Sequence, residues 1–278
     1  MVSPARSEVQ VIDQGRPQRE MWRVDAPDPK IRIEALTVRY SDETESLVNL
    51  WLDVPRNAVT VAFGPAGGGK STLLRTINRL NDLADVAQMS GRVLLDGEDV
   101  LDRTLDTIAL RRRIGMVFAR PVVLPLTIRQ NLTYGLELAG ITEAQIHLEA
   151  IERSLKDAAL WDEVIDRLDE PANALSGGQQ QRLCLARTLA LQPEVILLDE
   201  PTSGLDPIST GRVEASLEAL KQKYTILLVP HSPQQAARVA DFAAFVLDGQ
   251  VIEFAPGNEL FVHPRHPRTE DYVQGRFG

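Results

Sequence analysis

One short segment constrains the fold of this chain more than any other. Residues 64–72 read GPAGGGKST and fit the pattern G-x-x-x-x-G-K-[ST], which is typical of a loop that holds phosphates. The wholly apolar residues 59–63 precede the loop and predict a buried strand, and a helical pattern follows it. Glycines let the backbone turn tightly and bring N–H groups close to phosphate oxygens, while a helix N-terminus adds free donors. The segment therefore predicts a strand, a phosphate-binding loop and a helix in succession.

The side chains of this loop narrow the ligand to a nucleoside triphosphate with Mg²⁺. Lys70 supplies a positive charge to the β- and γ-phosphates, and Ser71 offers a hydroxyl to the metal. The alternative is a glycine-rich turn that binds nothing, which the flanking strand and helix disfavour. We expect every position of the loop to line the nucleotide: Gly64, Pro65, Ala66, Gly67, Gly68, Gly69, Lys70, Ser71 and Thr72.

Apolar runs and helical patterns alternate along much of the chain. The runs that predict strands are residues 31–38, 59–63, 195–198 and 225–229. The patterns that predict helices are residues 71–80, 179–191 and 209–221. Strands this apolar are typical of a parallel sheet covered on both faces, so the alternation predicts an α/β fold with a mainly parallel sheet.

The middle of the chain differs, because residues 121–175 are mainly helical in pattern. We interpret this stretch as a helical subdomain inserted into the α/β core. Thr142 and Gln145 form a candidate capping box for one of its helices. Four apolar residues would then line one face of that helix: Ala144, Leu148, Ile151 and Leu155.

Polar residues follow two of the predicted strands. Asp199 and Glu200 come after residues 195–198, and His231 comes after residues 225–229. Ligands gather at the carboxyl ends of strands in open α/β sheets. Asp199 would hold Mg²⁺ through a water, Glu200 would orient the attacking water, and His231 would contact the γ-phosphate or steady Glu200. A solvated acidic turn and a structural histidine are the alternatives, which the nearby phosphate loop disfavours.

A second candidate anion site begins a helix. Residues 175–182 read LSGGQQQR, in which Ser176 and Gln179 match a capping box. An ordinary helix start is one interpretation. The same start can bind phosphate, because Gly177 and Gly178 expose backbone N–H groups and Ser176 presents its hydroxyl.

The composition excludes several classes of protein. Of the 278 residues 44% are hydrophobic and 25% are charged, as in ordinary globular proteins. The net charge of −9 disfavours a general nucleic-acid binder, so we expect no nucleic-acid partner. A single cysteine excludes an internal disulfide framework. Neither a signal peptide nor an apolar run near the roughly 20 residues of a membrane span is present, so we expect a soluble protein.

The motifs occur in an order that resembles the nucleotide-binding subunits of ATP-binding-cassette (ABC) transporters: the glycine-rich loop, LSGGQ, the Asp-Glu strand, the SGLD of residues 203–206, and His231. The resemblance covers residues 31–278. It implies a P-loop NTPase (RecA-like) core with a mainly parallel sheet, an N-terminal antiparallel β part and an inserted α-helical signature subdomain at about residues 120–186. Residues 1–30 would be a polar N-terminal extension.

The resemblance also implies how ATP is bound. Two copies would dimerise head to tail, with each ATP between the phosphate loop of one chain and the LSGGQ segment of the other. We call this segment, residues 175–179, the signature turn. Ser176 and Gly178 would contact the γ-phosphate, with Gly177 and Gln179 in the same turn. Asp206 would cross the dimer seam, and Tyr40 would stack on adenine.

Several segments, among them residues 93–99, 159–164 and 268–278, resemble more narrowly the ATPase subunits of bacterial phosphate importers. This implies two membrane-spanning permease subunits, a periplasmic phosphate-binding protein as an indirect partner, and a peripheral location on the cytoplasmic face of the membrane. An importer of another small solute, a soluble ABC ATPase of DNA repair or translation, and a non-hydrolytic ATP-gated scaffold are the alternatives.

One position departs from the family pattern. The family usually has glutamine after the strand that ends near Phe118, where it contacts Mg²⁺ and joins the core to the helical subdomain. Here that position is Ala119. A methyl group can perform neither polar role, whereas a water can replace one oxygen ligand of Mg²⁺. We therefore expect ATP binding to survive and coupling to membrane subunits to be affected most.

Overall fold

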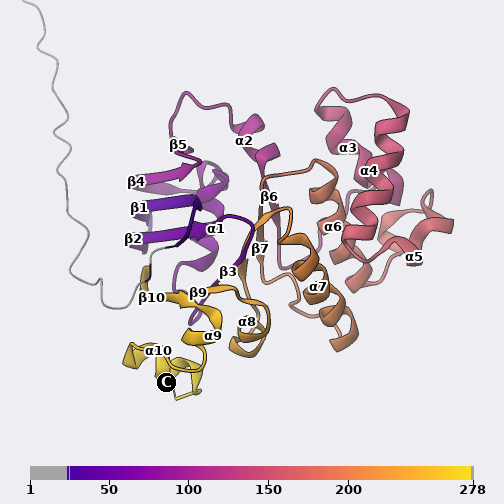
Figure 1. Ribbon diagram of the computed structural model, residues 1–278. Coiled ribbons are helices and arrows are strands. Elements are labelled where there is room, and N and C mark those ends of the chain that lie inside the picture. Colours follow the sequence, from indigo (N-terminus) through magenta and orange to yellow (C-terminus); the bar gives the residue numbers. More distant parts are fainter. Residues whose placement is uncertain (1–23, 25, 277–278) are drawn as a thin grey trace, which may run out of the picture.

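Two sheets and a group of helices make up the computed structural model, which describes residues 24 and 26–276 (Figure 1). The strands are β1 (Pro29–Tyr40), β2 (Glu45–Pro55), β3 (Val59–Phe63), β4 (Val86–Leu95), β5 (Glu98–Asp99), β6 (Ile114–Val117), β7 (Val195–Asp199), β8 (Thr225–Val229), β9 (Phe242–Leu247) and β10 (Gln250–Pro256). The helices are α1 (Lys70–Ile77), α2 (Thr107–Arg113), α3 (Ile128–Leu138), α4 (Ala144–Asp157), α5 (Trp161–Val164), α6 (Gly177–Ala190), α7 (Pro207–Leu220), α8 (Pro233–Val239), α9 (Gly257–Leu260) and α10 (Pro267–Val273).

The larger sheet is mainly parallel. Its six strands lie in the order β10-β9-β3-β8-β7-β6, and only the β10–β9 pair among them is antiparallel. The smaller sheet is antiparallel, in the order β2-β1-β4-β5. Every residue of β3, β7 and β8 is buried, as their apolar sequences predict for strands covered on both faces. The predicted α/β fold class, with an antiparallel N-terminal part, is confirmed.

Alternate residues of each central strand enter two different cores. Val195 and Leu197 face the smaller sheet and α1, in a cluster that also holds Leu73 and Leu74 of that helix. Ile196 and Leu198 face the opposite side, in a cluster shared with α6 and α7. The β-strand period of two therefore lets one strand support both layers. α1, which begins at the phosphate loop, is fixed between the two sheets.

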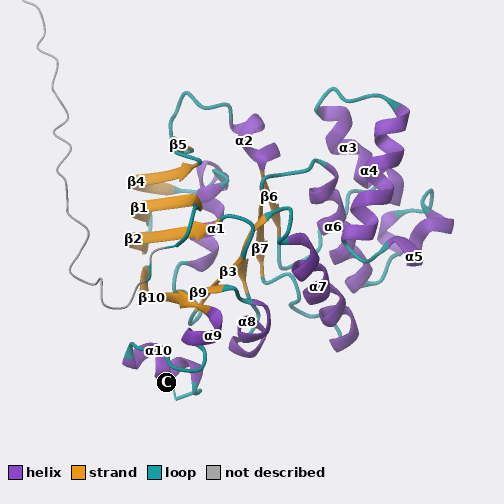
Figure 2. Cartoon of the chain, viewed as in Figure 1, coloured by secondary structure: helices purple, strands orange, loops and turns teal. Residues whose placement is uncertain are grey.

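Helices α3 to α6 gather on one side of the strands (Figure 2), where a helical subdomain was predicted. The predicted capping box at Thr142 is wrong, because α4 begins after Glu143 without a side-chain cap. The predicted apolar stripe is wrong in its first half, since Ala144 and Leu148 are exposed. Burial in α4 is confined to its second half, where tertiary packing covers these residues: Ala150, Ile151, Ser154 and Leu155. Periodicity alone does not show which turns of a helix are covered.

The predicted polar extension over residues 1–30 falls mostly outside the described residues. Of its described part, Val24 packs against the core and donates a backbone hydrogen bond to Phe254 O at 3.1 Å.

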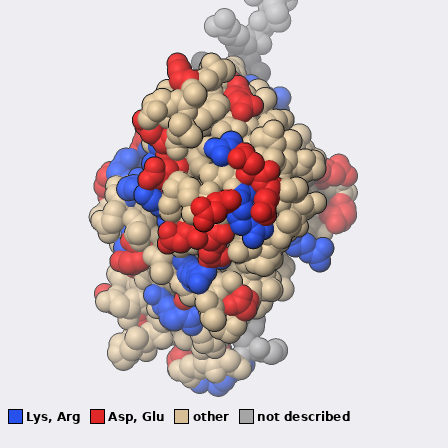
Figure 3. Space-filling model, turned by 90° about the vertical axis from the view of Figure 1, so that its right-hand side faces the viewer, with Lys and Arg blue, Asp and Glu red and all other residues tan. Residues whose placement is uncertain are grey.

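Within the described part of the chain, no helix is both long and apolar enough to cross a membrane. Acidic and basic side chains are intermingled on the face shown in Figure 3.

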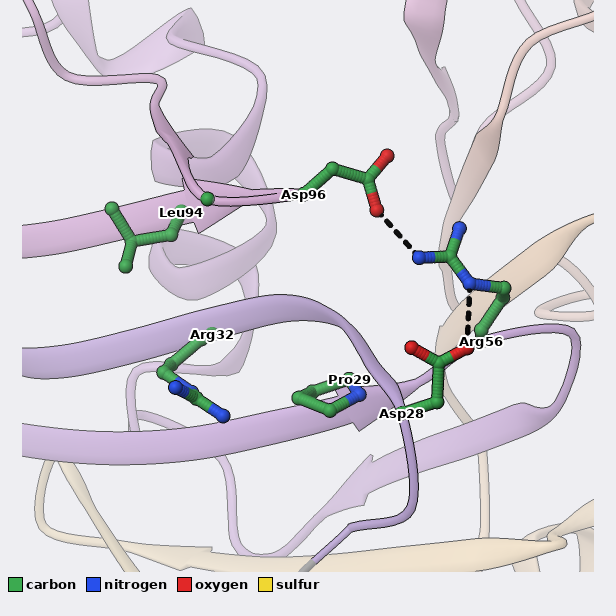
Figure 4. Close-up of a pocket in the computed structure, with 7 residues that line it drawn as sticks. Asp28, Pro29, Arg32, Arg56, Leu94 and Asp96 are labelled. Carbon is green, nitrogen blue, oxygen red and sulfur yellow. Dashed lines mark hydrogen bonds and ion pairs between the residues drawn. The ribbon is translucent and has the colours of Figure 1, made fainter.

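An ion-pair network joins the edges of the two sheets. Lys30 at the start of β1 is buried and pairs with Asp96 and with Glu194, which directly precedes β7. Arg56 donates to Asp96 at 2.6 Å and to Asp28 at 2.8 Å beside a surface pocket (Figure 4). These pairs connect the start of β1, the end of β4 and the start of β7, which are far apart in the sequence. They lie at the amino end of β7, whereas the phosphate loop follows the carboxyl end of β3 in the same sheet.

Replacement of Lys30 by methionine is expected to lower the free energy of unfolding by about 1–3 kcal/mol, because two carboxylates lose a buried partner. Burial alone would raise the pKa of Asp96, but hydrogen bonds from Lys30 and Arg56 lower it below its ordinary value. Hydrogen bonds from Arg113 and Lys30 lower the pKa of Glu194. Both folded pKa values lie below the unfolded ones. The stabilisation is therefore complete above about pH 5, where the unfolded carboxyl groups are also charged, and is lost as the pH falls through the folded values.

Urea denaturation at a series of pH values measures this effect. Lys30→Met is expected to flatten the fall in stability below about pH 5. Arg32→Met is the matched control, because Arg32 lies on the same strand and is half exposed in its pair with Asp53. Equal stabilities and equal pH profiles for the two variants would contradict the role given to Lys30.

Candidate nucleotide-binding and hydrolysis site

The phosphate loop has the backbone geometry that its glycines allow. Gly64, Gly67 and Gly69 have φ angles of 147°, 76° and 94°, in a region that other residues rarely adopt. A side chain at Gly64 would place Cβ 2.0 Å from Val246 O, and one at Gly69 would place it 2.2 Å from Ser46 O. Ala66 and Gly67 are exposed at the tip of the loop. Glycine is thus required at two positions by close packing as well as by backbone angle.

Lys70 folds back over the loop that precedes it. Its ammonium donates to Gly64 O at 2.9 Å and Pro65 O at 2.6 Å. Burial lowers the pKa of Lys70 below its ordinary value, although the carboxylates of Glu200 and Asp199 act in the opposite direction. The loop and α1 therefore hold a partly desolvated cation over the loop that the sequence predicts to bind phosphate.

Ser71 and Asp199 form a donor set suited to Mg²⁺. The Ser71 hydroxyl donates to Asp199 Oδ1 at 3.0 Å, and Asp199 is only 7% exposed at the carboxyl end of β7. Mg²⁺ usually takes one or two carboxylates, with phosphates and waters as its other ligands. A hydroxyl and a carboxylate held together beside the phosphate loop fit that pattern.

Tyr40 lies beside the loop at the end of β1. Its hydroxyl is 3.1 Å from Thr72 Oγ1, which also accepts a hydrogen bond from Ser46 Oγ at 2.7 Å. The Thr72 side chain therefore supports Tyr40 from α1, and its buried hydroxyl already has protein partners. No local sequence pattern identifies Ser46, because its partner Thr72 is 26 positions away on another element.

Glu200 and His231 come together beyond the ends of β7 and β8. His231 Nδ1 is 4.0 Å from Glu200 Oε2, and both side chains are substantially exposed. Glu200 has a φ of 46°, which is uncommon for a residue with a side chain, and its N–H donates to Val229 O at 2.9 Å. The residues predicted for metal binding and hydrolysis thus share one edge of the sheet with the phosphate loop.

Gln235, which no sequence motif predicted, connects the turn at His231 to the segment after Glu200. Its Oε1 accepts a hydrogen bond from the His231 N–H at 2.9 Å, and its Nε2 donates to Thr202 Oγ1 at 2.8 Å. Gln235 is 3% exposed. No local pattern identifies such a residue, because one of its partners is 33 positions distant.

The signature turn has the predicted capping box. Ser176 Oγ accepts the Gln179 N–H at 3.3 Å, and the Ser176 N–H donates to Gln179 Oε1 at 3.0 Å. Ser176 and Gly177 are exposed as predicted, whereas Gly178 is buried because it packs against Ser209 of α7. Within residues 24 and 26–276, no hydrogen bond or ion pair joins this turn to the phosphate loop. The two candidate phosphate sites of one chain therefore do not form a single contact network.

Asp206 begins α7 close to the signature turn. Its carboxylate accepts hydrogen bonds from Ile208 N at 2.9 Å, Ser209 N at 3.0 Å and Ser209 Oγ at 2.6 Å. The hydrogen bonds from Ser209 are the main cause of a lowered pKa for Asp206. A side chain at Gly178 would place Cβ 2.5 Å from Ser209 Oγ, so the starts of α6 and α7 pack closely.

Comparison with known proteins identifies the family. The sequence matches the ABC transporter family profile over residues 47–203. The chain belongs to the ABC transporter family. It is 49% identical over 259 residues to the phosphate import ATP-binding protein PstB of Shewanella denitrificans, covering 93% of this chain and 95% of that protein. It is 51% identical over 248 residues to PstB 2 of Aliivibrio fischeri, covering 89% and 91%. The resemblance found in the sequence motifs is confirmed.

Two solved ABC structures share the fold. CbiO1 of Clostridium perfringens, part of the ABC transporter complex cbiONQ, superposes with a TM-score of 0.75 at 26% identity, covering 90% of this chain and 97% of CbiO1. A bacterial Atm1-family ABC exporter with ATP bound superposes with a TM-score of 0.74 at 25% identity, covering 91% of this chain and 43% of the exporter chain.

Proposed function

We propose that this chain is the ATP-hydrolysing subunit of an ABC importer for inorganic phosphate. The observation that carries the hydrolytic part is the convergence of Lys70, the Ser71–Asp199 pair and the Glu200–His231 pair on one sheet edge. The proposed substrate rests on about 50% identity, along nearly the whole chain, to proteins named for phosphate import.

In the proposed reaction each side chain has a separate task. Lys70 and the loop N–H groups bind the β- and γ-phosphates of ATP. Ser71 and, through a water, Asp199 would hold Mg²⁺, which would supply charge neutralisation at those oxygens. Glu200 orients and polarises the attacking water, and His231 steadies Glu200 and hydrogen-bonds the γ-phosphate. Tyr40 stacks on adenine.

The complete site needs a second copy of the chain. In the proposed homodimer the Ser176–Gln179 turn of one copy contacts the γ-phosphate bound by the loop of the other, and Asp206 lies at the seam. Support comes from the exposure of Ser176 and Asp206. The helix start at Ser176 presents free N–H groups to an anion.

An apolar surface near Ala119 suits a membrane-spanning permease subunit. A pocket of about 320 Å³ between β6, α3 and α6 is lined by Met116, Leu124, Tyr134 and Leu191, and also by three arginines, Arg111, Arg112 and Arg187. Val122 and Leu138 beside it are 61% and 66% exposed. Docking here would place the chain on the cytoplasmic face of the membrane, with a periplasmic phosphate-binding protein acting through the permeases.

Phosphate uptake in a strain that lacks this chain tests the proposed function. Cells that express the wild-type chain are expected to regain uptake of labelled phosphate, and cells that express Lys70→Ala are not. Uptake of sulfate, measured in parallel, is expected to remain unaffected. Restored sulfate uptake without phosphate uptake would identify an importer of another solute. Full ATPase activity with no effect on any uptake would favour a soluble ABC ATPase.

Replacement of Ala119 by glutamine is expected to raise permease-coupled ATPase activity. Ala119 lies two residues beyond β6, and the preceding Phe118 carbonyl accepts a hydrogen bond from Gln181 of α6 at 2.8 Å. A glutamine here would supply an oxygen to Mg²⁺ at the joint between the core and the helical subdomain. Restored support around a metal is worth about 10–100-fold in activity.

The measurement is ATP turnover, as a function of Mg²⁺ concentration, by the chain assembled with its permeases in vesicles. Arg120→Gln places the same side chain one residue later and serves as the control. Unchanged turnover and unchanged Mg²⁺ dependence in Ala119→Gln would contradict the role given to this position.

A further inference from the structure

The Glu163 carboxylate on α5 lies at the centre of a polar cluster drawn from three helices. It accepts hydrogen bonds from Arg182 Nη1 at 2.6 Å and Nη2 at 3.0 Å, and from Gln179 Nε2 at 2.9 Å. It also pairs with Arg212. Gln179 and Arg182 belong to α6, whereas Arg212 belongs to α7. One carboxylate therefore connects the helical subdomain with the helix that follows Asp206.

Glu163 acts directly on the capping box of the signature turn. The Gln179 amide donates through Nε2 to Glu163 Oε2 and accepts the Ser176 N–H through Oε1. A carboxylate accepts hydrogen bonds but cannot donate them, so Glu163 fixes which end of the amide faces Ser176. A continuous chain of hydrogen bonds thus runs from Glu163 to the exposed serine of the turn.

Arg182 contacts the same turn from the interior of the protein. Its side chain is 2% exposed, and its guanidinium also donates to Ala159 O at 2.5 Å. Its Nε lies 3.4 Å from Gly178 O, one helical turn earlier. A buried guanidinium is tolerated only when its donors are paired, and Glu163 provides a bidentate partner.

The contact between α6 and α7 also involves Asp206, the second residue expected at the dimer seam. Gly178 packs against Ser209, whose hydroxyl donates to Asp206. Arg212 lies one turn beyond Ser209 on the same face of α7. The pair between Arg212 and Glu163 therefore adds a second connection between the starts of α6 and α7, across the boundary between helical subdomain and core.

We propose that Glu163 is a positioning residue that holds the Ser176–Gln179 turn against the Asp206 end of α7, in the pose that receives the γ-phosphate of ATP bound to a second copy. This inference rests on the proposed function, because Glu163 would control the ATP site that two copies of the chain form together. We call this shared site the composite site. The carboxylate remains charged at neutral pH, because the hydrogen bonds from Arg182 and Gln179 lower the pKa of Glu163 despite partial burial.

The experiment follows ATP-driven dimerisation in a Glu200→Gln background, where hydrolysis is slowed. Light scattering measures the ATP concentration at half-maximal dimer, and fluorescent ATP measures nucleotide affinity at protein concentrations that keep the chain monomeric. Glu163→Gln is expected to raise the half-maximal concentration by about tenfold or more, because a misplaced contact weakens the composite site strongly. Arg212→Gln, which removes an exposed partner, is expected to raise it by about two- to fivefold.

Arg129→Gln is the matched control. Arg129 pairs in bidentate fashion with Asp169 at 2.8 and 3.0 Å, and neither residue takes part in the hydrogen bonds of the signature turn. Its dimerisation curve is expected to match that of the parent. The affinity of the monomeric chain for ATP is expected to be the same in all variants. A variant that failed to fold would lose this affinity, so an unchanged value shows that the variant is folded.

Two outcomes would overturn the inference. The first is that Arg212→Gln and a folded Glu163→Gln dimerise at the parent's ATP concentration. The second is that both variants lose monomeric ATP affinity as much as they lose dimerisation. If Glu163→Gln fails to fold, Arg212→Gln decides, since its side chain is 47% exposed. A parent that never dimerises with ATP would instead contradict the proposed function itself.

Discussion

Replacing Lys70 with alanine is expected to abolish ATP hydrolysis. Lys70 is the positively charged residue of the phosphate loop. Its ammonium donates hydrogen bonds to the Gly64 and Pro65 carbonyls. Loss of hydrogen bonds to charged phosphates weakens ATP binding by about 10–100-fold. Loss of charge stabilisation as the γ-phosphate leaves lowers the hydrolysis rate by a further ~10²–10³-fold.

Fluorescent ATP titration and phosphate release by the purified chain measure the two effects separately. Arg75→Ala is the matched control, because Arg75 is an exposed cation in the last turn of the same helix, α1. This control is expected to retain both activities. ATP binding by Lys70→Ala at the affinity of the control would contradict the assignment of the phosphate site.

Replacing Glu200 with glutamine is expected to slow hydrolysis while leaving ATP binding nearly unchanged. The substitution keeps the size of the side chain and removes its ability to polarise water. Loss of a general base lowers the rate by about 10²–10⁴-fold. Glu200 has an exposed side chain 4.0 Å from His231, so its replacement leaves no buried partner unpaired.

Phosphate release compared with wild type is the measurement, and Glu218→Gln is the control. Glu218 lies on α7 and is 71% exposed, outside the hydrolysis site. Equal rates for Glu200→Gln and the wild type would favour an ATP-gated scaffold over an ATPase. A matching loss of ATP affinity would instead indicate that Glu200 supports binding.

The parts of the site that were predicted from sequence share one physical property. The phosphate loop and its flanking strand have strict local requirements, namely positive φ at glycines and burial on both faces of β3. Such requirements leave a contiguous pattern in the sequence. The capping box at Ser176 is equally local, since its two hydrogen bonds span three residues.

The missed features depend on contacts between distant segments. Ser46, Gln235 and Glu163 each act through a partner on another element, so no window of sequence identifies them. Conversely, Thr142 had a local capping pattern that the folded chain does not use, because α4 begins after Glu143. Local chemistry predicts a possible contact, and tertiary packing decides which contacts form.

The most direct test of the composite site is the mass of the Glu200→Gln chain in solution with and without MgATP. We predict a particle of twice the 30.8 kDa chain mass only when ATP is present. Adding Ser176→Arg is expected to abolish this dimer while leaving ATP binding by the single chain intact. A chain that stays at 30.8 kDa in saturating ATP, or a dimer that persists with Ser176→Arg, would contradict this prediction.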